Sequence, residues 1–233
     1  LTASSIATYG TFALNSYSLD LVSSSDVTMD GVISGTGGLT KAGAGNLSLS
    51  ALNTYTGATL ITAGTFTVSG GLSDSTAITI NSGATYVVNA DDRIASLSGE
   101  GDMTLNYTLT LGDATNTSFS GVISGVGGLT KVGTGELILS GANTYTGATN
   151  INVGALTIAG SLSDSTAVTV ASSATYNVNA SDTVGSIAGG GAITTSTTGA
   201  KVLTVGGDGT STTFSGVLSD GSGSLALTKI GAG

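Results

Sequence analysis

Three aspartates and one arginine are the strongest candidates for chemistry in this sequence. Asp91, Asp92 and Arg93 are consecutive, and Asp182 matches Asp92 in a second copy of the same stretch. Two carboxylates with a nearby cation form the arrangement that polysaccharide-cleaving enzymes use for acid–base chemistry. However, Arg93 becomes Thr183 in the second copy, and the first of the paired aspartates is lost as well. We therefore interpret these residues as a solvated corner and predict that no residue is catalytic.

The residue types that most other active sites need are missing. The sequence has no His and no Cys, which excludes Ser-His-Asp and Cys-His nucleophilic sites, ordinary zinc sites and disulfides. Asp208 lies in a Gly-Gly-Asp-Gly stretch that is similar to calcium-binding repeats, but the nine-residue pattern is not iterated. We predict no metal-binding residue, no cofactor-binding residue and no cofactor.

Three further sets of residues recur and have structural interpretations. They are the lysines Lys41, Lys131 and Lys229, the tyrosines Tyr55 and Tyr145, and the asparagines Asn53 and Asn143. We expect the lysines at outward strand positions, where charge discourages edge pairing. We expect the tyrosines to pack at corners of the fold and consider a sugar-binding role less favoured. We expect the asparagines to form turns or to hydrogen-bond to backbone groups.

These residues recur because the sequence repeats itself. The stretch 31–59 returns at 121–149 with 22 of its 29 positions unchanged, and a third copy begins at Gly216. Self-similarity at a fixed period is typical of repeat architectures. We predict one continuous array over 1–233, divided into the tail of a preceding repeat (1–30), two repeat units (31–120 and 121–215) and the start of a further repeat (216–233). The five extra residues of the second unit are expected in a surface loop around 196–201.

Composition limits the partners. The chain has 38 Gly and no Pro, 39% of its residues are hydrophobic, and its net charge is −9. Such an acidic surface is a poor match for nucleic acid or for an anionic membrane surface. The first residues lack the pattern of a signal peptide, and no apolar run has the length of a membrane-spanning helix.

Short alternating segments predict the fold class. Apolar residues alternate with Thr or Ser over three to five residues, and Gly-rich corners separate these segments. This favours an all-β solenoid with parallel strands over a β-sandwich, with coils of roughly 20–25 residues, about four coils per unit and a rod on the order of 50 Å long. The residues predicted to be buried are Leu47, Leu49, Phe66, Val68, Leu137, Leu139, Leu156 and Ile158, whereas Thr157 is predicted to face solvent.

The best-repeated blocks resemble a known family. Residues 35–50 and 53–59, their copy at 125–149 and the partial copy at 227–233 closely resemble the autotransporter-associated β-strand repeat. The resemblance implies a right-handed parallel β-helix in the passenger of a secreted bacterial surface protein. In that family the repeat forms the stalk and is associated with passage across the outer membrane.

We therefore expect a non-enzymatic β-solenoid stalk at the bacterial cell surface, serving adhesion, display or extracellular matrix. One alternative is a self-assembling filament subunit that stacks head to tail, and a second is a polysaccharide-acting β-helix enzyme. The expected partners are further repeats or copies of the chain along the solenoid axis, and surface glycans or proteins of a host or neighbouring cell. Such partners would cover both ends, which are not capped by atypical polar sequence.

Overall fold

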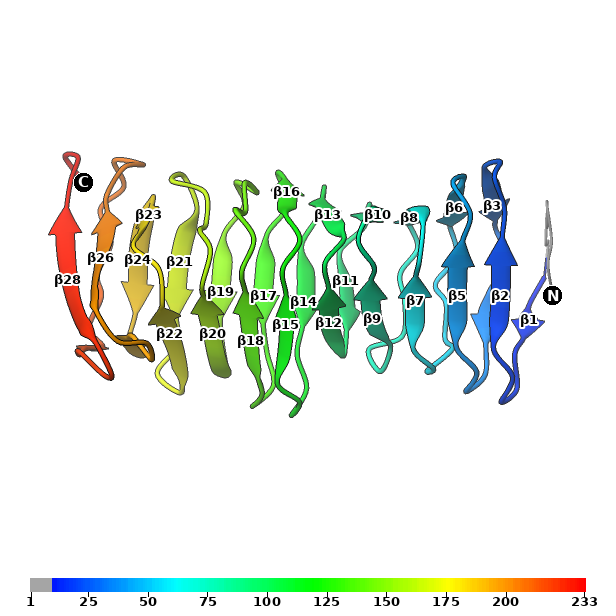
Figure 1. Ribbon diagram of the computed structural model, residues 1–233, viewed down its shortest axis with the longest axis horizontal. Helices are drawn as coiled ribbons and strands as arrows, with labels where there is room; N and C mark the ends of the chain where they lie inside the picture. The colour runs from blue at the N-terminus through cyan, green and yellow to red at the C-terminus, as the bar shows by residue number, and fades with distance from the viewer. Residues whose placement is uncertain (1–9) are drawn as a thin grey trace.

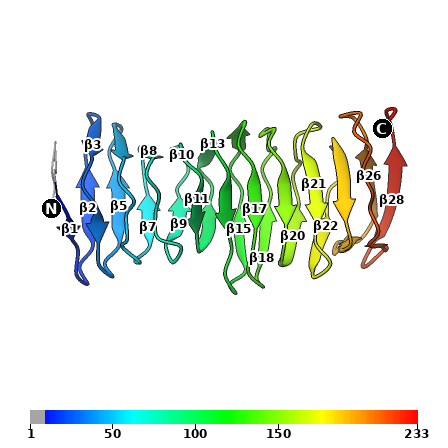
Figure 2. The same cartoon turned by 180° about the vertical axis from the view of Figure 1, so that it is seen from behind.

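The chain winds into a single rod of stacked parallel strands. The computed structural model describes residues 10–233, in which every regular element is a strand. Each turn of the coil lies on the one before, and the first and last described residues lie at opposite ends of the rod (Figure 1). The view from behind shows the same regular stacking on the opposite side (Figure 2). The predicted all-β solenoid with parallel strands is confirmed.

The strands occupy three sides of the coil. Side 1 is a continuous sheet of eleven strands: β2 (Leu19–Val22), β5 (Leu39–Ala42), β7 (Thr59–Ile61), β9 (Ala77–Ile80), β12 (Ser96–Gly99), β15 (Thr117–Phe119), β18 (Glu136–Leu139), β20 (Gly154–Ile158), β22 (Ala174–Val178), β25 (Ala192–Thr194) and β27 (Val217–Leu218). Side 2 holds β3 (Val27–Met29), β6 (Asn46–Leu49), β8 (Gly64–Val68), β10 (Ala84–Val88), β13 (Asp102–Leu105) and β16 (Ile123–Gly125), and then β23 (Asp182–Val184), β26 (Ala200–Val205) and β28 (Ser224–Lys229). Side 3 holds β1 (Phe12–Ala13) and β4 (Ile33–Ser34), and then β11 (Asp92–Ile94), β14 (Leu109–Leu111), β17 (Leu129–Lys131), β19 (Thr149–Ile151), β21 (Ala167–Val170) and β24 (Ser186–Gly189).

One turn of the coil takes about 20 residues. In side 1, Leu39 pairs with Thr59, and Thr59 pairs with Ile78. Ten steps between eleven strands, at about 4.8 Å each, give a rod of roughly 50 Å. The predicted length is therefore reproduced, with turns at the short end of the expected range.

The repeat of the sequence and the repeat of the coil have different lengths. Four turns carry the chain along side 1 from Leu39 to about Thr117, and two further sides carry it to Leu129, the copy of Leu39. Thus 90 residues make about four and two-thirds turns, not the four predicted. Leu39 lies on side 1, and Leu129 lies on side 3. The same sequence block therefore builds different sides of the rod in successive copies.

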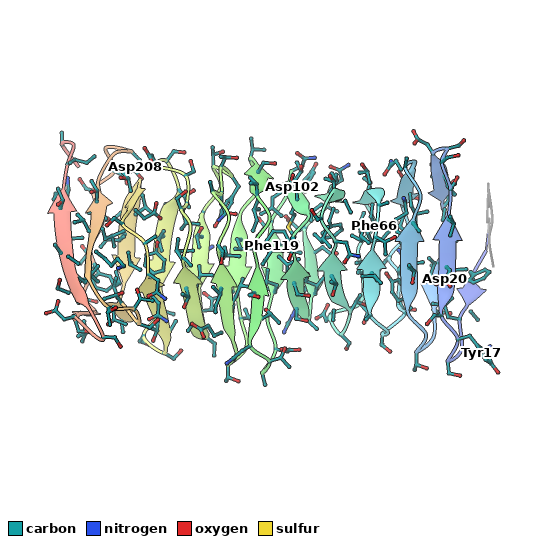
Figure 3. The ribbon with its side chains drawn as sticks, in the orientation of Figure 1. Tyr17, Asp20, Phe66, Asp102, Phe119 and Asp208 are labelled. Carbon is teal, nitrogen blue, oxygen red and sulfur yellow. The ribbon has the colours of Figure 1, made fainter. Side chains whose placement is uncertain are left out.

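The core consists of aligned rows of inward side chains. All eight residues predicted to be buried are at most 1% exposed. Rows on neighbouring turns are in register, so that like side chains stack, and the rings of Phe66 and Tyr86 lie 5.7 Å apart at 21°. Figure 3 shows Phe66 and Phe119 within the coil and Tyr17 projecting from its edge. Burial of these rows is the main stabilisation of the rod.

The prediction that Thr157 faces solvent freely is wrong. Its side chain lies on the outer face of β20, yet only 1% of the residue is exposed. The hydroxyl donates a hydrogen bond to Glu136 one turn earlier and accepts one from Asn177 Nδ2, at 2.9 Å, one turn later. In-register stacking aligns outward side chains as well as inward ones, so polar neighbours above and below cover the threonine.

Glycines form corners where strands on neighbouring turns approach closely. Gly43 and its copy Gly133 have φ of 80° and 72°, in the left-handed region. A Cβ on Gly43 would lie 2.2 Å from the carbonyl oxygen of Ser23 on the preceding turn. The five extra residues of the second unit fall partly in the exposed turn at 196–199, as predicted.

Candidate functional site

The strand ladder is interrupted once on each of two sides, and an asparagine bridges each gap. On side 3 no strand lies between β4 and β11, and Asn53 lies in this gap. Its Oδ1 accepts a hydrogen bond from Ile33 N at 2.9 Å, and its Nδ2 donates to Ala51 O and Gly71 O at 2.7 and 3.2 Å. The side chain thus satisfies backbone groups that a missing strand would otherwise leave unpaired.

The second copy repeats this arrangement on side 2, between β16 and β23. Asn143 Oδ1 accepts from Ile123 N at 3.0 Å, and Nδ2 donates to Gly141 O and Ser161 O at 3.0 and 2.9 Å. Both asparagines are at most 2% exposed. The predicted backbone-bonding role of these residues is confirmed.

The aspartates considered for catalysis close the same two gaps. Asp92 Oδ1 accepts from Leu72 N at 3.0 Å and from Arg93 N at 2.9 Å, and Asp182 Oδ2 accepts from Leu162 N at 3.0 Å. The interpretation as a solvated corner is therefore wrong for these two carboxyls, since Asp182 is only 7% exposed. Each carboxylate takes the place of a backbone hydrogen-bond acceptor in the strand ladder. This role depends on which residues stack on neighbouring turns, so the composition of the sequence does not reveal it.

Burial changes the ionisation of these carboxyls. Loss of solvation raises the pKa of Asp182 to about 6, although backbone hydrogen bonds from Leu162 and Thr183 oppose the shift. The pKa of Asp92 is raised for the same first reason. A raised carboxyl pKa is common among general acids, but burial alone also produces it. It indicates catalysis only where a second catalytic group lies within reach.

No such pairing exists between the two aspartates. Asp92 lies on side 3 and Asp182 on side 2, with more than four turns between them, or roughly 20 Å at the usual strand spacing. Glycosidase carboxylates are about 5–9.5 Å apart. Arg93 points outward and lies 3.5 Å from Asp74 as an exposed ion pair. Asp92 and Asp182 are therefore too far apart to act as the two carboxylates of one glycosidase site.

The tyrosines lie in the core next to these gaps. Tyr55 and Tyr145 are fully buried, and their hydroxyls are hydrogen-bonded to Thr59 and Thr149 at 2.6 Å. Burial, the largest cause, raises the pKa of both phenols above the ordinary range. The interpretation as packed corner aromatics is confirmed, and neither ring can stack on a sugar.

The recurrent lysines occupy a position that we predicted wrongly. Lys41 and Lys131 lie at inward strand positions and are 1% and 2% exposed. Lys131 Nζ donates to Val132 O, Gly133 O and Val153 O at 2.7, 2.9 and 3.4 Å, and Lys41 repeats this contact set on its own corner. Desolvation lowers the pKa of both lysines. Their ammonium groups tie two neighbouring corners together, and only the three-dimensional coil shows that the side chain reaches them.

Asp208 organises a turn. Its Oδ1 accepts hydrogen bonds from Thr210 N at 2.9 Å and from Thr210 Oγ1 at 2.7 Å. Within residues 10–233 no group of three acidic side chains converges as metal ligands would.

A surface groove that the sequence analysis did not identify lies around Tyr107. It has a volume of about 370 Å³ and runs along the corner before side 3, across four turns. Its lining residues are Asp91, Asn106, Tyr107, Thr108, Val126, Gly127, Gly128, Gly147, Ala148 and Asn150. Tyr107 is 52% exposed, unlike the four buried core tyrosines. One feature of the sequence pointed to this residue. Tyr107 lies two residues before Leu109, just as Tyr17 lies two residues before Leu19 in the preceding copy.

Comparisons with known proteins agree with the architecture. A family model described as the passenger-associated-transport-repeat matches residues 39–68 and 129–158. The chain carries two transport repeats. It is also 35% identical over 142 residues to a protein named "Adhesin BmaC autotransporter" from Brucella suis biovar 1 (strain 1330), an alignment that covers 56% of this chain and 4% of that protein. No solved structure matches the chain.

The transport repeats coincide with the joints of the rod. Residues 39–68 contain Lys41, Asn53 and Tyr55, and residues 129–158 contain their copies. Each transport repeat thus supplies one lysine-tied corner and one asparagine-bridged gap. The predicted resemblance to the autotransporter passenger repeat is confirmed. Residues 10–233 contain no helix long and apolar enough to span a membrane.

Proposed function

We propose that this chain is part of the stalk of a secreted bacterial surface protein, a non-enzymatic passenger solenoid that serves adhesion, display or extracellular matrix. The proposal includes a right-handed coil, which is the hand that parallel strand crossovers adopt in nearly all cases. The relative that the chain matches is named as an autotransporter adhesin, and this supports an extracellular location.

The observation that carries the proposal is that the transport repeats build the joints of a continuous rod. The residues with unusual chemistry, Asp92, Lys131 and Asn143 among them, are engaged with backbone groups of neighbouring turns. Such a rod extends by about 4.8 Å for every 20 residues, which suits a spacer between a cell surface and an exposed end.

Cell-surface labelling tests the location. Antibodies raised against the folded chain should bind intact cells of the bacterium that makes it, and deletion of its gene should reduce attachment of those cells to host cells or to one another. Antigen that becomes accessible only after lysis would contradict the proposal.

An enzyme is the alternative that the aspartates leave open. We expect no turnover when the purified chain is incubated with a panel of neutral and acidic polysaccharides and reducing ends are measured. Cleavage that is abolished by Asp92→Asn or Asp182→Asn would replace the stalk proposal with a catalytic one.

A filament subunit that stacks head to tail is the second candidate. On the final turn Val217, Leu227 and Ile230 are 64%, 44% and 41% exposed, so that turn presents apolar surface along the rod axis. Either a following coil or a second copy of the chain would cover it. Concentration-dependent rods in electron microscopy and sizing would support head-to-tail stacking, and a monodisperse monomer at high concentration would exclude it.

A further inference from the structure

We propose that the groove around Tyr107 binds a neutral saccharide, which would give the proposed adhesive role a ligand class. In this groove a half-exposed aromatic ring and polar side chains with unused hydrogen-bonding atoms lie beside a floor made mainly of glycine backbone.

Tyr107 is not a core tyrosine. The core tyrosines Tyr55, Tyr86, Tyr145 and Tyr176 are fully buried, whereas Tyr107 is half exposed at the mouth of the groove. An exposed aromatic face offers apolar surface on which the C–H face of a sugar ring can stack, while the phenol edge stays hydrated. An exposed aromatic ring leaves apolar surface in water, which is less favourable than burying it. A polar residue at this corner would not carry that cost.

Polar groups surround the ring on three turns of the coil. Asp91 Oδ1 accepts from Thr108 N at 2.9 Å, which fixes the carboxylate and leaves its other oxygen without a partner among the described residues. Asn106 Nδ2 donates to Asn89 Oδ1 at 2.6 Å, and Asn106 Oδ1 has no hydrogen-bond partner among the described residues. The Asn150 amide has no hydrogen bond within the described part of the chain. The carboxylate can accept hydrogen bonds and the two amides can both accept and donate them, so together they match the hydroxyls of a sugar.

The floor of the groove is made of backbone. Gly127 and Gly128 lie one turn beyond Tyr107, and Gly147 and Ala148 lie two turns beyond. A Cβ on Gly127 would lie 2.0 Å from the carbonyl oxygen of Tyr107, so close stacking of the turns requires glycine there. The absence of side chains leaves a trough of about 370 Å³, near the lower limit for small-molecule sites and sufficient for a short oligosaccharide.

Charge selects among saccharides. Asp91 places a carboxylate in the groove, and the chain carries a net charge of −9. Both repel uronate, sialate or sulfate groups, and no cation lines the groove. The geometry therefore favours hexoses, pentoses and N-acetylhexosamines without acidic substituents.

The corner 90 residues earlier in the chain supplies a natural control. Tyr17 occupies the place of Tyr107, is 77% exposed, and projects from the N-terminal end of the rod in Figure 3. There Ser16 replaces Asn106 and Leu60 replaces Asn150, while the glycines recur as Gly37-Gly38 and Gly57. That corner keeps the ring and the floor but lacks the amides, so it should bind a sugar much more weakly.

The test uses the whole chain and a panel of trisaccharides: maltotriose, cellotriose, laminaritriose, chitotriose and trigalacturonate. Saturation-transfer NMR identifies binding and titration calorimetry gives the affinity. At least one neutral member should bind, trigalacturonate should not, and Tyr107→Ala should weaken binding about tenfold, the scale of a lost aromatic contact. Asn150→Leu, which imports the residue of the first unit, should also weaken binding, and Tyr17→Ala should leave it unchanged.

Circular dichroism should show every variant folded, because the altered side chains are outside the core. Absence of binding by all neutral members, equal binding by trigalacturonate, or equal loss in Tyr17→Ala and Tyr107→Ala would each overturn the inference. The stalk proposal is tested by surface labelling and attachment, so it would survive the failure of this groove to bind sugar.

Discussion

Replacement of Asn143 by alanine should destabilise the rod more than any single change at its surface. The side chain makes three hydrogen bonds to backbone groups of three different turns: from Ile123 N at 3.0 Å, and to Gly141 O and Ser161 O at 3.0 and 2.9 Å. It is 2% exposed, so water cannot replace the lost partners without entering the gap between β16 and β23.

The magnitude follows from these contacts. Three neutral hydrogen bonds contribute about 1 kcal/mol each, and a buried N–H left unpaired adds about 1–3 kcal/mol of lost solvation. We therefore expect Asn143→Ala to reduce the free energy of unfolding by about 4 kcal/mol. Asn143→Asp retains the acceptor for Ile123 N–H but turns an oxygen toward the carbonyls of Gly141 and Ser161. It should be at least as harmful at neutral pH and partly recover at acidic pH, where the carboxyl can donate.

Urea unfolding followed by far-ultraviolet circular dichroism measures both effects. Asn53→Ala serves as a replicate, because Asn53 makes the same contacts on another side of the rod. The exposed Asn152 serves as the matched control, and Asn152→Ala should remain within about 0.5 kcal/mol of the parent. A loss below 1 kcal/mol in both Asn53→Ala and Asn143→Ala would refute the view that these side chains replace missing strands.

Four other substitutions test the core and the remaining contacts between turns, with the free energy of unfolding as the measurement. Leu139→Ala should cost about 2–5 kcal/mol, because removal of its fully buried side chain leaves a cavity. Thr157→Ala should cost about 1–2 kcal/mol, because two hydrogen bonds to neighbouring turns are lost. A neutral Thr157→Ala would show that these outward hydrogen bonds add no stability. Lys131→Met should cost about 2–3 kcal/mol, because three backbone carbonyls lose their hydrogen-bond donor. Lys201→Met is the control and should be nearly neutral, because it removes one exposed hydrogen bond. Equal effects would contradict the role of Lys131 in joining two neighbouring corners. The pKa of Asp182 is raised from 3.8 to about 6, so its neutral form is favoured in the folded state. This stabilisation is full below pH 3.8 and lost as pH rises through about 6, amounting to about 3 kcal/mol; Asp182→Asn should remove this dependence, and an unchanged pH profile would count against the buried carboxyl.

Alternation and repetition were sufficient to predict the solenoid and its core. Leu139 and Ile158 are buried as predicted because strand geometry alone places alternate residues on one face. The length of a turn was nearly right, since strand and corner lengths can be counted along the sequence.

Contacts between turns were not predictable in the same way. Lys131 was placed outward because charge at an outward strand position discourages edge pairing. The carbonyls that bind its ammonium group come partly from Val153 on the next turn. Asp182 was taken as solvated because its partner, Leu162 N, lies one turn away. A single sequence shows what each turn contains, but the offset that decides which residues meet on neighbouring turns depends on the coil. Tyr107 was overlooked for that reason, since its groove is assembled from four turns.

Deletion of residues 31–120 should yield a shorter rod with the same fold. The unit makes about four and two-thirds turns, so its removal rotates everything after the junction by one side of the coil. The contacts across the new junction nevertheless keep their residue types: Leu129 would stack on Leu19 where Leu39 does now, and Lys131 would stack on Leu21 in place of Lys41. A deletion of 31–110 is the control, because it ends inside β14 and brings Leu111 to the place of Gly31. At the copy of that glycine, Gly121, a Cβ would lie 1.7 Å from the carbonyl oxygen of Gly101 on the preceding turn. Circular dichroism and urea unfolding should show a cooperative β-rich protein for the first deletion and loss of cooperative unfolding for the second. If both deletions fold equally well, the 90-residue block is a feature of the sequence alone and the rod has no unit larger than a single turn.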